Sequence, residues 1–383
     1  MTNGTLSRRS EMKRITVLVS TLAISLATLL TSCNTLADEI RVEPSDWSEG
    51  VMSTSAWVMA GIGTSKTLNS DTLHLAYSTD GLTWTVLNSN SGIYTPTIGS
   101  RHIRDPYIFR KNDGTFVLLA EDYTGDGQAS DFGTGQDTDY GNNPSSKIYV
   151  AFSNDLVTWK YEHLLKLTEG KGTNGASRRV QTPRAVYNKI DRCYDIYWTG
   201  DDINGVNCTY VTQTYDFLSV KSLEDKIIFQ PGHTVTDALV VNANNKYYLF
   251  ARDARQPLIT KLGGDIQLAV ANTWGSEFSI LGSTDSISGY EKDYYINRGS
   301  NQNTLLQKSE PCVYQLTNGT WIMLVNDFLN DGSYTAYSTT DISDPTSWEE
   351  TSSVTKFSGT QMTVGTSVTR ITASELEILL AAF

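Results

Sequence analysis

Cysteine and histidine are scarce in this chain of 383 residues, which contains only four of each. None of them is spaced as the ligands of a metal site are, so the sequence predicts no metal centre. Positive charge is also in short supply, because Lys and Arg total 30 against 42 Asp and Glu and are scattered. A net charge of −12 without a basic block argues against a nucleic-acid partner and against a basic membrane-binding patch.

Long apolar runs and helical patterns are missing as well. The apolar stretch Ile15–Leu30 has 16 residues, fewer than the roughly 20 that a spanning helix needs. It follows Lys13 and Arg14 and leads into Leu-Thr-Ser-Cys33, so the sequence predicts a signal peptide with a lipobox over residues 1–33. No later segment has the 3.6-residue period of an amphipathic helix, and we expect almost no helix in the mature chain.

The lipobox predicts where the protein resides. A lipid on Cys33 followed by a polar tether at residues 34–50 is typical of an exported bacterial lipoprotein in the periplasm or on the outer-membrane surface. That lipid is then the only expected contact with a membrane. An ordinary secretory signal with an incidental cysteine is the alternative.

Three cysteines remain after Cys33, which is an odd number for an exported protein. Cys193 and Cys208 flank a turn and could face each other on adjacent strands, so a disulfide and two buried thiols are both open. We expect Cys312 to be a small buried apolar residue.

What the chain does contain is a repeat. In four segments a short polar or acidic residue next to proline or a small residue leads into an alternating strand. A polar turn, a second aromatic-rich strand and a third strand follow each of them, and Asp-x-x-x-Trp steps recur at Asp80, Asp155 and Asp344. A repeated unit of about four strands is typical of a β-propeller blade. The four segments are Arg104–Phe109, Gln181–Tyr187, Thr236–Val241 and Ser309–Tyr314.

The leftover pieces predict how the propeller closes. The strands around Trp57 and Leu73 lack a first strand, and the strand at residues 366–372 stands alone. Paired together they make a fifth blade that leaves no open edge. We therefore predict an all-β domain over residues 51–383, a five-bladed β-propeller whose fifth blade is closed by the N- and C-terminal strands.

This organisation resembles glycoside hydrolase family 43 over about residues 55–375. The resemblance rests on Arg-Asp-Pro-Tyr-Ile, Thr-Asp-Ala-Leu-Val and Ser-Glu-Pro at the starts of the first, third and fourth blades. It implies that Asp105 is the general base, that Asp237 tunes the pKa and orientation of the acid, and that Glu310 is the general acid. The intervals of 132 and 73 residues between these carboxylates suit the family.

Glycoside hydrolysis explains why two carboxyl groups are needed. One protonates the leaving oxygen while the other activates water on the opposite face of the sugar, and inverting enzymes hold them roughly 6.5–9.5 Å apart. We expect Glu310 to have a raised pKa and Asp105 to stay ionised, helped by Arg104.

Further residues are candidates for binding the substrate. Arg184 could contact sugar hydroxyls or serve as a structural ion-pair partner, and Arg252 could reach the mouth of the channel. His102 lies three residues before Asp105, and Trp57 could stack on a sugar ring.

No cofactor is expected. Many members of the family carry a histidine in the last blade near a bound cation, but Val-Gly-Thr stands at residues 364–366 here. The Asp-rich loop 122–144 does not have the ligand spacing of an EF-hand, so the sequence does not support a structural calcium or sodium ion.

The expected activity is that of an inverting hydrolase that releases terminal α-L-arabinofuranose or β-D-xylose from plant-type polysaccharides, acting as a monomer. A non-catalytic surface propeller that binds glycans is the alternative. Fructoside hydrolysis ranks lower, since no Asn-Asp-Pro-Asn nucleophile motif occurs between Ala37 and Arg101.

Overall fold

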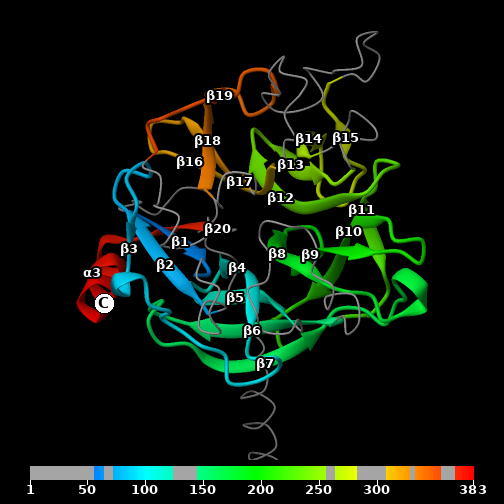
Figure 1. Cartoon of the computed structure of the whole chain (residues 1–383), viewed down its shortest axis with the longest axis horizontal. Helices are drawn as coiled ribbons and strands as arrows, with labels where there is room; N and C mark the ends of the chain where they lie inside the picture. The colour runs from blue at the N-terminus through cyan, green and yellow to red at the C-terminus, as the bar shows by residue number, and fades with distance from the viewer. Residues whose placement is uncertain are drawn as a thin grey trace, which may run out of the picture. The chain divides into compact units, whose positions relative to one another are not determined.

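The computed structural model (Figure 1) describes residues 56–63, 72–123, 145–255, 264–282, 308–327, 333–354 and 367–383. The predicted signal peptide and tether lie outside these residues. Residues 52–111 and 115–383 form one compact unit, whose fold is given below; the other unit comprises residues 1–51 and a turn at 112–114. Within the described ranges, no helix is long and apolar enough to cross a membrane.

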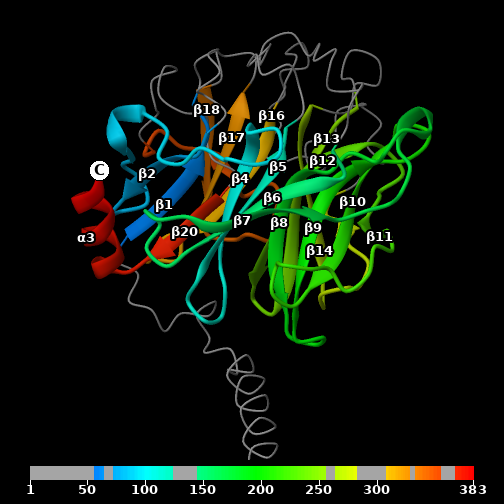
Figure 2. The same ribbon diagram turned by 90° about the horizontal axis from the view of Figure 1, so that it is seen from below.

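Five antiparallel sheets of four strands each form the blades, which confirms the predicted five-bladed propeller (Figures 1 and 2). Blade 1 contains β4 (Ile103–Arg110), β5 (Phe116–Asp122), β6 (Lys147–Ser153) and β7 (Lys160–Lys166). Blade 2 contains β8 (Gln181–Asn188), β9 (Cys193–Asp201), β10 (Asn207–Thr214) and β11 (Lys226–Phe229). Blade 3 contains β12 (Val235–Ala243), β13 (Lys246–Asp253), β14 (Asp265–Ala271) and β15 (Ser279–Ile280). Blade 4 contains β16 (Lys308–Gln315), β17 (Trp321–Asp327), β18 (Ser333–Thr339) and β19 (Glu349–Glu350).

Blade 5 combines the two ends of the described chain, as predicted. Its strands are β20 (Ser367–Ile371), β1 (Ala56–Gly61), β2 (His74–Ser78) and β3 (Thr85–Val86), in that order. Short 3₁₀ turns η1 (Asn88–Asn90) and η2 (Thr173–Gly175) lie in connections. Hydrogen bonds between β4 and β20 join blade 1 to blade 5. Among them, the N–H of Ile108 donates to Ser367 Oγ at 2.9 Å, and Thr369 Oγ1 donates to the Ile108 carbonyl at 2.8 Å.

The first strands form the inner wall of the propeller. Each contacts the first strand of the blade before it and of the blade after it, in the order β20, β4, β8, β12, β16 and back to β20. In Figure 1, β4, β8 and β20 lie near the centre of the five sheets. The first strand of each blade is therefore the strand whose side chains can face the propeller axis.

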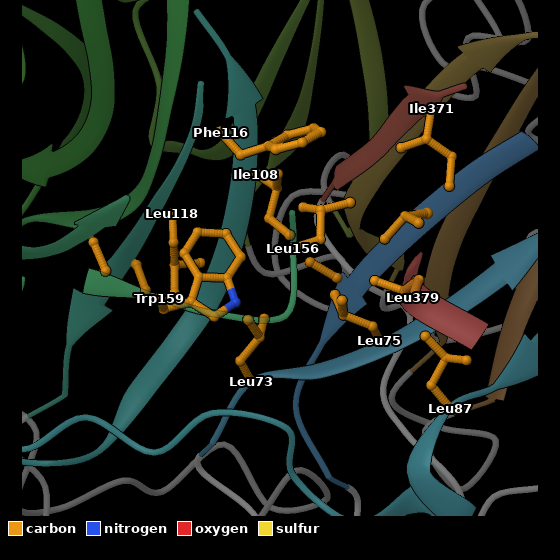
Figure 3. Close-up of a cluster of buried hydrophobic side chains, with 14 of the residues drawn as sticks. Leu73, Leu75, Leu87, Ile108, Phe116, Leu118, Leu156, Trp159, Ile371 and Leu379 are labelled. Carbon is orange, nitrogen blue, oxygen red and sulfur yellow. The ribbon is translucent and has the colours of Figure 1, made fainter. Parts of the chain in front are cut away.

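Apolar side chains fill the space between neighbouring blades. The layer between blades 5 and 1 contains Leu75, Ile108, Phe116 and Ile371, all 5% exposed or less (Figure 3). Four similar layers separate the other pairs of blades. Because strands alternate between faces, each blade needs apolar residues on both sides, which explains the near-continuous apolar runs of the second strands.

The Asp-x-x-x-Trp steps mark the turn after the third strand of blades 1, 4 and 5. The Asp155 carboxylate accepts a hydrogen bond from the backbone N–H of Thr158 at 2.7 Å, and Trp159 is buried in the layer beside it. The same arrangement recurs at Asp80 with Trp84. Asp stabilises such turns because its side chain accepts from backbone N–H groups two and three residues ahead.

One helix lies where the sequence showed no helical pattern. After β20 the chain forms α3 (Ala373–Ala382), which begins at a capping box in which Thr372 and Glu375 bond each other's backbone N–H. Glu375 also pairs with Arg110 of blade 1 at 2.7 Å, and Leu379 packs into the layer of Figure 3. The periodic apolar stripe is too short to detect, but Thr-x-x-Glu is a recognisable signal.

The disulfide alternative is wrong. Cys193, Cys208 and Cys312 are free and buried. Cys193 pairs in register with Asn188 at one end of β9, while Cys208 lies opposite Gly200. Seven residues of strand, roughly 24 Å, separate these places, far beyond the reach of a disulfide.

Candidate active site

A β-bulge interrupts the first strand of four blades at equivalent positions. The strand register shifts there, and the first residue of each bulge has a positive φ between 46° and 59° although none is glycine. The next residue is proline in three blades. A bulge tolerates proline because the residue at that position does not need to donate a hydrogen bond to the neighbouring strand. The four bulge residues are Asp105, Thr182, Asp237 and Glu310.

This backbone geometry is costly and is repeated four times. A non-glycine residue in the left-handed region costs on the order of 1–3 kcal/mol, and such residues concentrate at functional sites. A bulge also changes the direction in which a side chain leaves its strand. We infer that the bulges direct four side chains toward the axis, and three of these are the carboxylates singled out in the sequence.

Hydrogen bonds link the bulges of blades 2, 3 and 4 to the blade that precedes each of them. The N–H of Thr182 donates to the Asp105 carboxylate, and the N–H of Glu310 donates to Asp237 Oδ2 at 3.3 Å. The N–H of Asp237 donates to Thr199 Oγ1 at 3.2 Å, and Thr199 Oγ1 bonds Thr182 Oγ1 at 2.9 Å. The carboxylates therefore have fixed positions relative to one another across three blade boundaries.

The charges of these carboxylates also shift the pKa values of Asp105 and Glu310. Burial, followed by the charge of Asp237, raises the pKa of Asp105 to about 6, and Arg184 and Arg104 oppose that rise. Burial, followed by the charges of Asp105 and Asp237, raises the pKa of Glu310 well above its usual range. Near pH 7 Asp105 is thus mostly ionised, whereas the shift of the Glu310 pKa favours its protonated form.

Arg184 lies beneath this cluster and is fully buried. Its Nε donates to the Ala238 carbonyl at 2.9 Å, next to the bulge of β12, and its guanidinium carbon lies 5.6 Å from the centre of the Tyr107 ring. The charge of Arg184 lowers the pKa of both Asp105 and Glu310. Of the two predicted roles, the structural and electrostatic one fits this burial, because no surface is left for a substrate.

Three other predicted binding residues are partly buried. Arg104 and His102 are partly buried on or beside β4, and the Arg104 guanidinium carbon lies 3.5 Å from the centre of the Tyr123 ring. Arg252 is partly buried on β13, opposite the residue before Asp237.

Trp57 does not fit the proposed stacking role. It is 2% exposed in the apolar layer between blades 4 and 5, where a Cβ on Gly81 would lie 3.6 Å from its ring. Trp57 lies on β1, which is the second strand of its blade, whereas β20 is the first. Its ring therefore packs against a neighbouring blade.

Sequence reasoning missed a second set of four residues at the ends of the second strands. Each pairs in register with the residue that precedes a bulge, and Arg252 alone among them was a candidate. A polar residue at the end of an apolar second strand was the available signal. The four residues, which we call the second-strand set, are Glu121, Thr199, Arg252 and Asn326.

Two members of the second-strand set lie beside catalytic candidates. Asn326 is 3% exposed, and its Nδ2 donates to Glu310 Oε2. Glu121 is also 3% exposed, and burial, followed by the charge of Asp105, raises its pKa to about 8. A buried carboxyl group between blades is costly, so Glu121 belongs in the description of the site.

No group of three or more His, Cys, Asp or Glu residues in the described ranges could hold a metal ion. The Asp-rich loop beyond Tyr123 and the segment 364–366 lie outside those ranges.

The family model described as "Probable glycosyl hydrolase domain" matches residues 54–377. The chain belongs to this family, which is related to glycoside hydrolase family 43. The resemblance predicted from the motifs is thereby confirmed. A search of curated proteins finds no match.

Solved structures share the fold of this family-43-like propeller at low sequence identity. A family 43 β-1,3-galactosidase, solved with galactodeoxynojirimycin, has a TM-score of 0.50 at 9% identity, covering 76% of this chain and 90% of its own. An endo-1,4-β-xylanase from Bacteroides thetaiotaomicron has a TM-score of 0.49 at 14% identity, covering 81% and 96%. An α-L-arabinofuranosidase from Lactobacillus brevis has a TM-score of 0.42 at 18% identity, covering 64% and 71%.

Proposed function

We propose that this protein is an inverting glycoside hydrolase that releases terminal sugars from oligosaccharides or polysaccharides. The observation that supports this best is the contrast between the pKa values of two bulge residues. The pKa of Asp105 is about 6, so this group is mostly ionised near pH 7, whereas burial and the charges of two neighbouring carboxylates raise the pKa of Glu310 well above its usual range. An acid and a base poised in this way are what a single displacement at a glycosidic bond requires.

In the proposed reaction Glu310 donates its proton to the glycosidic oxygen as the bond to the anomeric carbon breaks. Asp105 takes a proton from the water that attacks the opposite face of the sugar. Asp237 keeps Glu310 protonated by its charge and fixes the bulge of β16 by accepting the N–H of Glu310. The products are a sugar of inverted configuration and an alcohol, and proton exchange with water restores both carboxyl groups.

The proposed sugar is α-L-arabinofuranose or β-D-xylose, as the family resemblance implies. Partly buried Arg104, His102 and Arg252 are the proposed binding residues. Because a β-1,3-galactosidase has the same fold, galactosides belong in any substrate test. We also propose export and lipidation at Cys33, which incorporation of labelled palmitate into the wild type and not into Cys33→Ser would test.

The decisive experiment measures hydrolysis of nitrophenyl arabinofuranoside, xyloside, galactoside and fucoside by the mature domain. Glu310→Gln should lower turnover of the preferred substrate by about 10²–10⁴-fold, since it removes the general acid. Glu169→Gln is the matched control, because Glu169 is exposed and pairs with Lys166 on the surface of blade 1.

The alternatives give different results. Equal activity in wild type and Glu310→Gln would overturn the site assignment. Glycan binding without turnover in the wild type, unchanged by Glu310→Gln, would instead support a non-catalytic glycan-binding propeller.

A further inference from the structure

The second-strand set has a common geometry that assigns a role to one of its members. Each residue stands opposite the residue before a bulge, and in two blades it bonds the bulge residue itself. Thr199 Oγ1 bonds Thr182 Oγ1 in blade 2, and Asn326 Nδ2 donates to Glu310 Oε2 in blade 4. In both blades the second-strand residue thus forms a hydrogen bond with the side chain of the bulge residue, which is a hydroxyl in blade 2 and the proposed general acid in blade 4.

The Asn326 amide has few other uses. It is 3% exposed at the inner end of β17, and its Oδ1 has no hydrogen-bond partner among the described residues. Burying an amide with one of its polar atoms unsatisfied is costly, and an apolar residue would fill the position without that cost. The bond to Glu310 is the interaction that explains an asparagine here.

We propose, on the basis of the hydrolase function above, that Asn326 is the positioning residue of the general acid. Its N–H occupies Oε2 of Glu310, so the proton is carried on Oε1 and faces the glycosidic oxygen. When that proton leaves with the alcohol, Glu310 becomes an anion between Asp105 and Asp237. The Asn326 N–H then stabilises this anion where two like charges oppose it.

The surroundings of Glu310 fix the direction of the expected effect. Asp105 of β4 and Asp237 of β12 raise its pKa, while Arg184 of β8 and Asn326 of its own blade lower it. Removing the donor should move the titration of Glu310 to higher pH by about one unit. A residue that only fills space would leave this titration where it is.

The first test needs no substrate. Carboxyl ¹³C NMR of the folded domain follows the titration of Glu310 in wild type, in Asn326→Leu and in Asn326→Met. Both substitutions fill the site with an uncharged side chain and remove the N–H donor, so both should raise the titration pH, and either one suffices if the other does not fold. An unchanged titration in a folded variant would overturn the proposal.

Asn188→Leu is the matched control. Asn188 is also a buried amide whose Nδ2 donates to a carboxylate, that of Asp195, but it lies at the outer end of β8. It should lose stability without moving the titration of Glu310.

The second test uses two leaving groups. Asn326→Leu should lower kcat/KM by about 10–100-fold for an alkyl glycoside, which needs a proton on its leaving oxygen, and by less for a dinitrophenyl glycoside. The alkaline limb of the pH profile should move upward as well. Equal losses on both substrates with an unmoved limb would mark a purely structural residue. If the wild type hydrolyses nothing, the proposed function fails while the NMR titration still decides the role of Asn326.

Discussion

Blades 2 and 4 have the same bulged backbone in their first strands but carry different residues at the bulge. Both carry a bulge with a positive φ, a following proline, and a second-strand residue that bonds the bulge side chain. Blade 2 presents Thr182 and blade 4 presents Glu310. The comparison indicates that the bulge is a feature of the propeller itself, and that the residue placed on it decides whether a blade contributes a reactive group.

The most direct test of this comparison removes a carboxylate from one bulge and, in parallel, the hydroxyl group from the bulge of blade 2. Asp105→Asn should lower kcat/KM by about 10²–10⁴-fold because the general base is lost. Thr182→Val, which removes only the hydroxyl bond in blade 2, should cost less than about tenfold. Steady-state kinetics measures both effects, with thermal unfolding as the check on folding. Similar losses in the two variants would mean that geometry, rather than residue type, limits the reaction.

A second experiment makes blade 2 resemble its neighbours. Thr182→Asp places a fourth carboxylate beside Asp105, and a like charge there should raise the pKa of Asp105 above about 6. The acidic limb of kcat/KM should then move upward by about one pH unit. Thr182→Asn has the same shape without the charge and should leave the limb in place. Coincident profiles for the Asp and Asn variants would contradict the electrostatic coupling.

The smallest expected effect concerns stability and the second-strand set. The pKa of Glu121 rises from 4.5 to about 8 on folding, so the folded state holds a proton that the unfolded state releases between these pH values. Stability from this group is therefore present below pH 4.5 and is lost as the pH rises toward 8.

Glu121→Gln removes that loss. It should raise the melting temperature at pH 8 by roughly 2–5 °C and leave it unchanged at pH 4, as measured by thermal unfolding. Thr199→Val is the control from blade 2 and should show no such pH dependence. A gain that is equal at both pH values would rule out the ionisation of Glu121 as its cause.

Much of the fold could be predicted because strand patterns repeat. The motifs around Asp105, Asp237 and Glu310 located three first strands, and the pairing of the terminal strands followed from counting blades. The register could not be predicted, since a bulge adds one residue that no pattern reveals. Asn326 and the separation of Cys193 from Cys208 depend on that register.

The remaining errors have local causes. The stacking role expected of Trp57 was wrong because this residue lies on the second strand of blade 5, whose first strand β20 comes from the other end of the sequence. Helix α3 was missed because its capping box, and not its short apolar pattern, identifies it. Protonation states were predicted in direction for Glu310, but the burial of Glu121 required the packing of blade 1 against blade 2.

The pairing of β1 with β20 has a consequence for the order of folding. β1 is among the first strands to emerge from the ribosome, and its partner is among the last, so its free edge must wait through most of synthesis. Closing so long a loop costs little more entropy than closing a moderate one, but it makes the final step slow. An unpaired apolar edge is also where chains associate wrongly. The synthesis of β20 therefore determines when the exposed edge of β1 is covered and can no longer pair with another chain.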